Sequence, residues 1–135
     1  MSGYSGTPLD KKLGLKPDMK VCIINKPKEL EAFFHGLSAL EFIENPIRDL
    51  DFILLFADSL KQYEKQFVRL SKTLKSNGML WVAWPKKASK VTTDLTENII
   101  RDFGLLNGMV DVKVCAIDER WSGLKFVIRV KDRTK

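Results

Sequence analysis

The sequence predicts a three-layer α/β fold, in which helices cover both faces of a mainly parallel sheet. Three observations predict it. Short apolar runs bounded by turn residues alternate with helical patterns, the run over 51–57 is apolar on both faces, and the last two β-rich runs are joined by a short turn. A strand that is apolar on both faces belongs inside a covered sheet. The short turn forces the two strands that it joins to run antiparallel.

Five apolar runs predict the strands of this sheet, and a sixth, 39–43, is a candidate for a short strand. The runs lie at 20–25, 39–43, 51–57, 79–84, 109–118 and 124–130. We expect one sheet in which only 124–130, in a C-terminal hairpin with 109–118, runs antiparallel, because right-handed crossovers leave few other ways to assemble the elements. Pairing of the short run 39–43 on the far side of 20–25 would let the helix between them cover the second face. It would also create a topological switch point beside 20–25.

Two helical patterns follow the first and third of these runs. A helix over 27–37 has apolar residues at helical spacing. The next helix begins near Ser59, which stands three residues before Gln62 as in a capping box. Its apolar stripe continues to Leu74, and we expect Gly78 to end it.

The remaining helix starts are predicted from caps. Asp94 and Glu97 have capping-box spacing before the apolar stripe that precedes 109–118. Near the start of the chain, Thr7 is placed to cap a short helix with Pro8 at its first position and Gly14 at its end. We therefore expect an arm with one short helix before the sheet begins.

The composition is typical of one soluble domain. Of 135 residues, 44% are hydrophobic and 30% charged, and we expect a single domain over 1–135, with the arm over 1–19, an α/β core over 20–130 and a basic tail over 131–135. No run approaches the roughly 18 apolar residues of a membrane span, so we expect a cytoplasmic protein with no membrane partner. The net charge of +6, with a basic excess over 61–92, leaves nucleic acid open as a partner.

The counts of cysteine and histidine exclude several kinds of chemistry. Two cysteines, Cys22 and Cys115, make neither a disulfide framework nor a zinc site, and both lie in apolar runs, where thiols are usually inert. The single histidine, His35, lies beside apolar helix positions, where packing is a commoner role than catalysis. The sequence therefore predicts no catalytic residues and no metal site.

The best candidate site follows the strand 79–84. Ligands of open α/β sheets lie beyond the carboxyl ends of the strands, and lysines and hydroxyls there suit a phosphate or carboxylate; a plain polar loop is the alternative. The turn around Trp121 either packs on the core or offers a stacking surface that flanks the same cleft. The candidate anion-binding residues are Asn25, Lys26, Lys28, Asp58, Ser59, Trp84, Lys86, Lys87, Lys90, Thr93, Arg120 and Trp121.

The order of elements, ending in a strand pair after LKSNGMLWVAWP, resembles the class I S-adenosylmethionine-dependent methyltransferase fold, a Rossmann-like architecture. More closely, GYSGTPLDKKLG, WPKKASKVTTDLT and VDVKVCAIDERWSGLKF resemble a family of small bacterial proteins of unknown function. The first resemblance implies a methyltransferase-like fold. The second implies a family and a fold more than an activity.

The methyltransferase resemblance departs from that fold's pattern at the cofactor site. Cofactor binding there uses a glycine-rich turn after the first strand and an acidic residue after the second. The first turn here is Asn25-Lys26-Pro27-Lys28, without glycine, and the second strand is shortened. These departures predict a degenerate scaffold with no cofactor.

Together the observations leave enzymatic activity open and favour a non-catalytic binding module for an anionic small molecule or a protein partner. Two alternatives remain. One is a divergent S-adenosylmethionine-dependent methyltransferase, and the other is a nucleic-acid-binding protein, which rests on charge.

Overall fold

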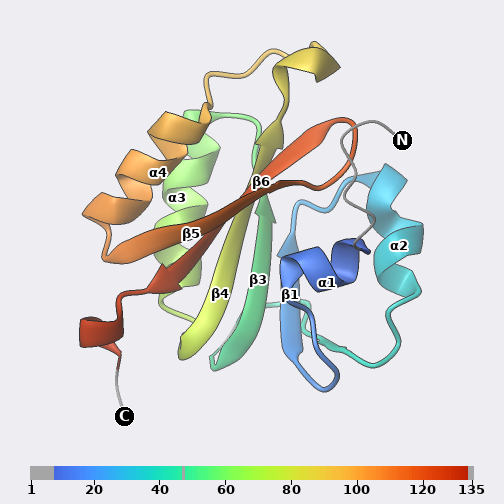
Figure 1. Cartoon of the computed structure of the whole chain (residues 1–135), viewed down its shortest axis with the longest axis vertical. Helices are drawn as coiled ribbons and strands as arrows, with labels where there is room; N and C mark the ends of the chain where they lie inside the picture. The colour runs from blue at the N-terminus through green and yellow to red at the C-terminus, as the bar shows by residue number, and fades with distance from the viewer. Residues whose placement is uncertain (1–7, 47, 134–135) are drawn as a thin grey trace.

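A computed structural model describes residues 8–46 and 48–133. Its centre is one six-stranded sheet with the strand order β2-β1-β3-β4-β6-β5 (Figure 1). The strands are β1 (Lys20–Ile24), β2 (Glu41–Phe42), β3 (Leu50–Phe56), β4 (Leu74–Pro85), β5 (Met109–Ala116) and β6 (Trp121–Ile128).

The direction of the strands confirms the predicted fold class. Strands β2, β1, β3 and β4 are paired in parallel. Strand β6 pairs antiparallel with both β4 and β5, so it is the strand that runs against the others. Strand β2 pairs on the outer side of β1, which makes the boundary between β1 and β3 a topological switch point, as predicted.

Helices lie on both faces of the sheet. Figure 1 shows α3 and α4 together on one side and α1 and α2 together on the other. The helices are α1 (Leu9–Leu13), α2 (Glu31–His35), α3 (Leu60–Ser71) and α4 (Glu97–Leu106), with short 3₁₀ turns η1 (Lys28–Leu30), η2 (Lys87–Ser89) and η3 (Val130–Asp132). None of the helices in the described ranges is long and apolar enough to cross a membrane.

The side chains of the central strands alternate between two hydrophobic clusters. Ile53 and Leu55 of β3 belong to the cluster under α3 and α4, whereas Phe52 and Leu54 belong to the cluster under α1 and α2. Because both faces of β3 are buried, the run over 51–57 carries no polar face, as the sequence predicted. The indole of Trp81 in β4 donates to the main-chain oxygen of Leu13 at 2.9 Å, which fastens α1 to the sheet.

The predicted end of the helix at Gly78 is wrong. Helix α3 ends at Ser71, and residues from Leu74 onward form the first part of β4. A Cβ atom at Gly78 would lie 2.9 Å from the main-chain oxygen of Leu50. Gly78 therefore does not end a helix. It allows β3 and β4 to approach closely at the point where their register shifts.

The two N-terminal helices also differ from the expectation. Helix α1 ends at Gly14, which has a left-handed φ of 84°, but Pro8 is its N-cap rather than its first residue, and Thr7 lies outside the described residues. The helix predicted over 27–37 is shorter, because η1 precedes a five-residue α2. Short 3₁₀ turns are frequent at the ends of α-helices.

Candidate functional site at the carboxyl edge of the sheet

The parallel strands β1, β2, β3 and β4 end at the same edge of the sheet. Ligands of open α/β sheets bind beyond this edge, beside the switch point. Two cavities flank the switch point between β1 and β3. We call them the β1–β2 cavity and the β4–α4 cavity.

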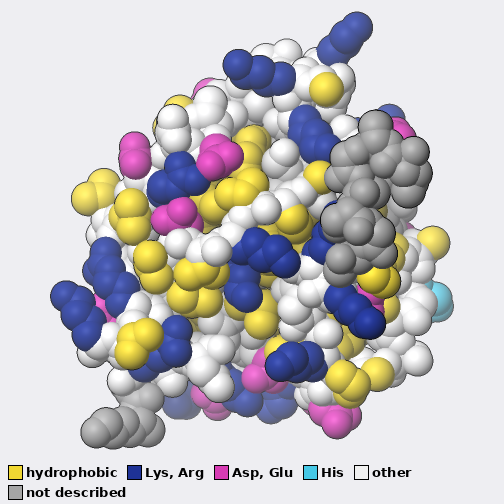
Figure 2. All heavy atoms as spheres, in the orientation of Figure 1, with side chains coloured by type: hydrophobic (Ala, Val, Ile, Leu, Met, Phe, Trp, Pro, Cys, Tyr) yellow, Lys and Arg dark blue, Asp and Glu magenta, His cyan; other side chains and the backbone are white. Residues whose placement is uncertain are grey.

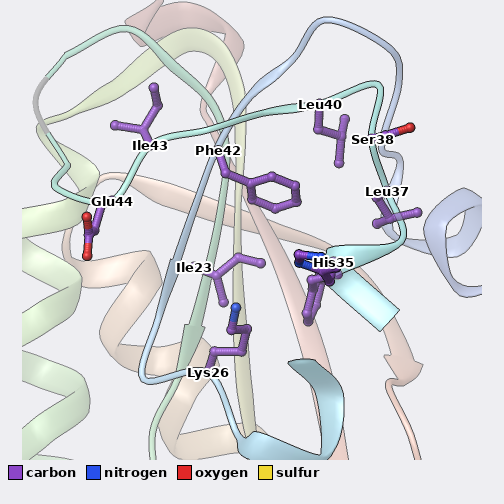
Figure 3. A pocket seen from close by; sticks show the side chains of 10 residues that line it. Ile23, Lys26, His35, Leu37, Ser38, Leu40, Phe42, Ile43 and Glu44 are labelled. Atoms are coloured by element: carbon purple, nitrogen blue, oxygen red, sulfur yellow. The ribbon is translucent and has the colours of Figure 1, made fainter. Parts of the chain in front are cut away.

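The β1–β2 cavity has a volume of about 520 Å³. Its walls include the apolar side chains of Ile23 and Phe42, and its polar groups include Lys26, His35 and Glu44. Figure 3 shows Lys26 and Glu44, from the segments after β1 and β2, toward one end of the cavity and the α2–β2 segment at the other. This volume lies within the usual range for small-molecule sites.

The turn after β1 has no glycine but keeps a glycine-like conformation. Asn25 has a φ of 60°, in the left-handed region that asparagine tolerates better than most residues. Its side-chain amide donates to the main-chain oxygen of Phe56 at 3.2 Å, which joins the ends of β1 and β3. Lys26 pairs with Glu31 at 3.6 Å, and the exposed Lys28 begins η1.

The β4–α4 cavity, of about 560 Å³, collects the candidate residues that follow β4. Of the residues predicted from sequence, it is lined by Trp84, Lys86, Lys87, Lys90 and Thr93. Trp84 is 7% exposed and so forms a recessed wall. The structure therefore brings these five side chains together, as the loop composition suggested, whereas Lys26 lines the β1–β2 cavity and Asn25 and Lys28 line neither cavity.

Asp58 and Ser59 line neither cavity and act in the local structure of the α3 start. The Ser59 hydroxyl accepts from the Gln62 main-chain nitrogen at 3.2 Å, and the Gln62 side chain accepts from the Asp58 nitrogen at 3.0 Å. This is the predicted capping box with one difference: the Gln62 side chain accepts from the nitrogen of Asp58, whereas in a regular capping box it accepts from the nitrogen of the cap residue, here Ser59.

The predicted capping box of Asp94 and Glu97 does not form. Helix α4 begins at Glu97, and its cap is Thr96, whose hydroxyl accepts from the Ile99 nitrogen at 3.2 Å. The Asp94 carboxylate instead accepts from the Leu60 nitrogen at 2.7 Å and so caps the neighbouring helix α3. A carboxylate is stabilised at that end because free N–H groups and the helix dipole point toward it.

The β5–β6 turn packs back on the sheet. Main-chain nitrogens of Arg120 and Trp121 both donate to Asp118 Oδ1 at 2.8 Å. The Trp121 ring meets Phe56 edge to face, with centroids 5.0 Å apart, and Arg120 donates to Glu29 at 3.2 Å. Neither Arg120 nor Trp121, the first residue of β6, lines the two cavities, and the Trp121 indole nitrogen has no hydrogen-bond partner among the described residues.

The thiols are not activated. Burial raises the pKa of the Cys22 thiol, and burial likewise raises the pKa of Cys115. Raised thiol pKa values leave the thiolate scarce at neutral pH, which agrees with the expectation of inert cysteines. In the described part of the chain, no group of three or more His, Cys, Asp or Glu side chains could hold a metal ion.

Sequence reasoning missed Glu44. Glu44 is the first acidic residue after β2, which is where the methyltransferase fold has an acidic residue. Because β2 has only two residues, its end could not be located from the apolar pattern alone. His35 was assigned to packing, yet it is exposed and lines the β1–β2 cavity.

The fold is similar to solved methyltransferase structures. A putative type 11 methyltransferase from Sulfolobus solfataricus has a TM-score of 0.58 at 16% identity, covering 94% of this chain and 93% of that one. Magnesium protoporphyrin IX methyltransferase from Synechocystis PCC 6803, with bound S-adenosylmethionine, has a TM-score of 0.59 at 10% identity, covering 89% and 77%. A fibrillarin pre-rRNA processing protein from Methanococcus jannaschii has 0.54 at 14%, covering 84% and 67%.

No protein-family model matches the sequence, and no curated protein matches it. The structural likeness, at such low identity, establishes a Rossmann-like methyltransferase fold. It also corrects the expectation of a non-catalytic binding module, because several of the similar structures are methyltransferases and favour the alternative that the sequence had left second. One of these similar structures contains S-adenosylmethionine, a cofactor that the sequence analysis did not expect for this chain.

Proposed function

We propose that the protein is a divergent S-adenosylmethionine-dependent methyltransferase that binds its cofactor in the β1–β2 cavity. The observation that carries the proposal is the position of this cavity, which extends from the segment before β2 to the carboxyl ends of β1 and β2 beside the switch point, where Lys26 and Glu44 lie. When bound, S-adenosylmethionine supplies an electrophilic methyl group on a sulfonium. The chain's own groups bind and orient it.

The chemistry of the lining residues fits the cofactor. The Glu44 carboxylate is an acceptor for the two hydroxyls of a ribose, and the Lys26 ammonium suits the carboxylate of the methionine part. Ile23 and the Phe42 ring, which is 44% exposed although it is large and apolar, offer an apolar surface for the purine. An aromatic side chain left open on a two-residue edge strand is stabilised when a planar ligand covers it.

The turn after β1 also fits, although its sequence departs from the methyltransferase pattern. Glycine is favoured there because it adopts a left-handed conformation and lets the ligand approach the backbone. Asn25 adopts this conformation with a φ of 60°, and its side chain is turned away to bond to Phe56. The ion pair of Lys26 with Glu31 is solvent-exposed and therefore weak, so the lysine is free to exchange this partner for a ligand carboxylate.

Titration calorimetry with S-adenosylhomocysteine tests the proposal. The wild-type protein should bind it, and Glu44→Gln should weaken the affinity by about 10- to 100-fold, because a hydrogen bond to a charged acceptor contributes about 1.5–3 kcal/mol. Glu41→Gln is the matched control, since it removes the same charge from the same short segment at a residue that does not line the cavity.

Absence of binding to the wild-type protein at millimolar ligand would contradict the proposed function. Equal loss of affinity in the Glu44→Gln and Glu41→Gln variants would contradict the assigned position of the ribose. Melting temperatures of both variants, measured without ligand, separate loss of a contact from loss of the fold.

A further inference from the structure

We infer that the methyl acceptor is a small molecule bearing a phosphate group, which is held in the β4–α4 cavity. The role of this ligand as methyl acceptor rests on the proposed function, whereas the anion site itself follows from the residues that line the cavity. The cavity holds about 560 Å³ and lies at the same edge of the sheet as the β1–β2 cavity.

Positive charge at this cavity is uncompensated. Lys86, Lys87 and Lys90 all line it, and none of them has an ion-pair partner in the described part of the chain. Figure 2 shows Lys and Arg side chains around the top of the view, where Figure 1 places η2. Three like charges gathered on one short loop repel one another, and a bound anion removes that repulsion.

The carboxylates near the cavity are engaged elsewhere. Glu97 lines the cavity but pairs with Arg101, four residues later on α4. The Asp94 carboxylate caps α3 through the Leu60 nitrogen. Neither side chain is therefore available to neutralise the lysines, and the lining keeps an excess of positive charge.

Hydroxyl groups complete the donor set. Thr96 accepts from the Ile99 nitrogen with its hydroxyl oxygen, so its own hydrogen remains available to donate. Ser122 on β6 also lines the cavity. Ammonium and hydroxyl donors around one space are the groups that bind phosphate oxygens.

The cavity favours a small molecule over a nucleic acid. Its aromatic wall, Trp84, is only 7% exposed, whereas single-stranded nucleic acids need exposed rings on which bases stack. On the face that Figure 2 shows, the Lys and Arg side chains are interspersed with Asp and Glu and form no continuous stripe. A volume near 560 Å³ is within the range of small-molecule sites.

The two cavities are lined by core residues from opposite faces of the sheet. Trp84 and Leu95 of the β4–α4 cavity belong to the cluster under α3 and α4, whereas Phe34 of the β1–β2 cavity belongs to the cluster under α1 and α2. Strands β1 and β4 are separated by β3 alone, and neighbouring strands lie about 4.8 Å apart, so the ends of β1 and β4 are about 10 Å apart. A molecule anchored by its phosphate in the β4–α4 cavity must therefore pass over this edge of the sheet to bring a nucleophile to the end of β1.

The test uses inorganic phosphate as the probe, in calorimetry and thermal melting at constant ionic strength against chloride. The wild-type protein should bind phosphate, and a variant with Lys86→Gln, Lys87→Gln and Lys90→Gln should lose at least about tenfold in affinity while keeping its melting temperature without ligand. The matched control changes the exposed residues Lys65, Lys72 and Lys131 to glutamine, which removes the same charge away from the cavity. The control should retain phosphate binding.

The outcomes separate this inference from the proposed function. Phosphate binding that the first variant alone loses, with S-adenosylhomocysteine affinity unchanged, supports the inference. If the wild type binds S-adenosylhomocysteine but not phosphate, or if both variants lose phosphate equally, the inference is overturned and the proposed function stands. If phosphate binds and S-adenosylhomocysteine does not, the anion site stands without an acceptor role. A single-stranded RNA oligonucleotide that binds through these lysines when phosphate does not would overturn the small-molecule assignment in favour of nucleic acid.

Discussion

Replacement of Asp94 by alanine tests how the loop beside the β4–α4 cavity is held. The Asp94 carboxylate accepts from the Leu60 nitrogen at 2.7 Å, at the first residue of α3, and the Thr93 hydroxyl donates to the main-chain oxygen of Asp58 at 2.6 Å. The loop before α4 is thus attached to the start of α3 at two points. Asp94→Ala removes one of them.

The expected loss is about 1–2 kcal/mol of the free energy of unfolding. Loss of a side-chain cap at a helix N-terminus costs about 0.5–2 kcal/mol. Asp94 is exposed, which reduces the value of its charge, but its bond is short and joins segments 34 residues apart. Asp94→Asn keeps an acceptor oxygen and loses only the attraction to the helix dipole, so we expect a smaller cost of about 0.3–1 kcal/mol.

Chemical denaturation of the variants measures these differences, and melting should follow at roughly 3–5 °C per kcal/mol for a chain of this size. Asp102→Ala is the control, since Asp102 is an exposed residue on α4 whose side chain makes no ion pair or hydrogen bond within the described ranges. It should change stability by no more than about 0.5 kcal/mol. An Asp94→Ala variant as stable as the Asp102→Ala control would refute the capping role.

Three further outcomes are expected. Gly104→Ala should destabilise the protein by about 1–3 kcal/mol in denaturation despite alanine's better helix propensity, because its Cβ would lie 2.2 Å from the Phe126 ring. Tyr63→Phe should cost about 1 kcal/mol in the same assay, because the buried hydroxyl donates to a main-chain oxygen of α4 at 2.7 Å. Burial raises the pKa of Cys22 and Cys115 above the ordinary value of 9.0, so above pH 9 the thiols of the unfolded chain ionise before those of the folded chain. The free energy of unfolding should therefore be retained below pH 9 and fall above it. A free energy of unfolding that does not fall above pH 9 would contradict this expectation.

Local pattern was sufficient for the sheet. The apolar run over 51–57 predicts a strand because burial on both faces leaves a direct trace in the sequence. The alternating run before Trp121 also predicts a strand, although its apolar side chains Val112 and Val114 are exposed in the structure. The short turn before β6 required an antiparallel hairpin, since a parallel connection needs a longer crossover. The switch point beside β1 was also predicted, from the right-handedness of crossover connections and from the need to cover both faces of the sheet.

The sequence alone also brought together part of the candidate site. Trp84 lies near the end of β4, and Lys86 and Lys87 follow that strand directly, so their common position at its carboxyl end needed no knowledge of distant contacts. Residues of one short loop that follows a strand lie at the same edge of the sheet, because the end of that strand places all of them. The site residues predicted from one loop were accordingly those that the structure gathers around one cavity.

Contacts between distant segments decided the rest. Leu74 continues the apolar stripe of a helix, yet it lies in β4 because it pairs with Leu50, and a leucine is compatible with either element until that partner is present. Asp94 has the spacing of a local cap but caps α3, because only the tertiary fold brings the Leu60 nitrogen to it. Glu44 joins Lys26 around the β1–β2 cavity because β2 pairs with β1 and ends at Phe42; the pairing was predicted, but the apolar run over 39–43 did not fix where the strand ends, because a two-residue strand is defined by its partner and not by its own pattern.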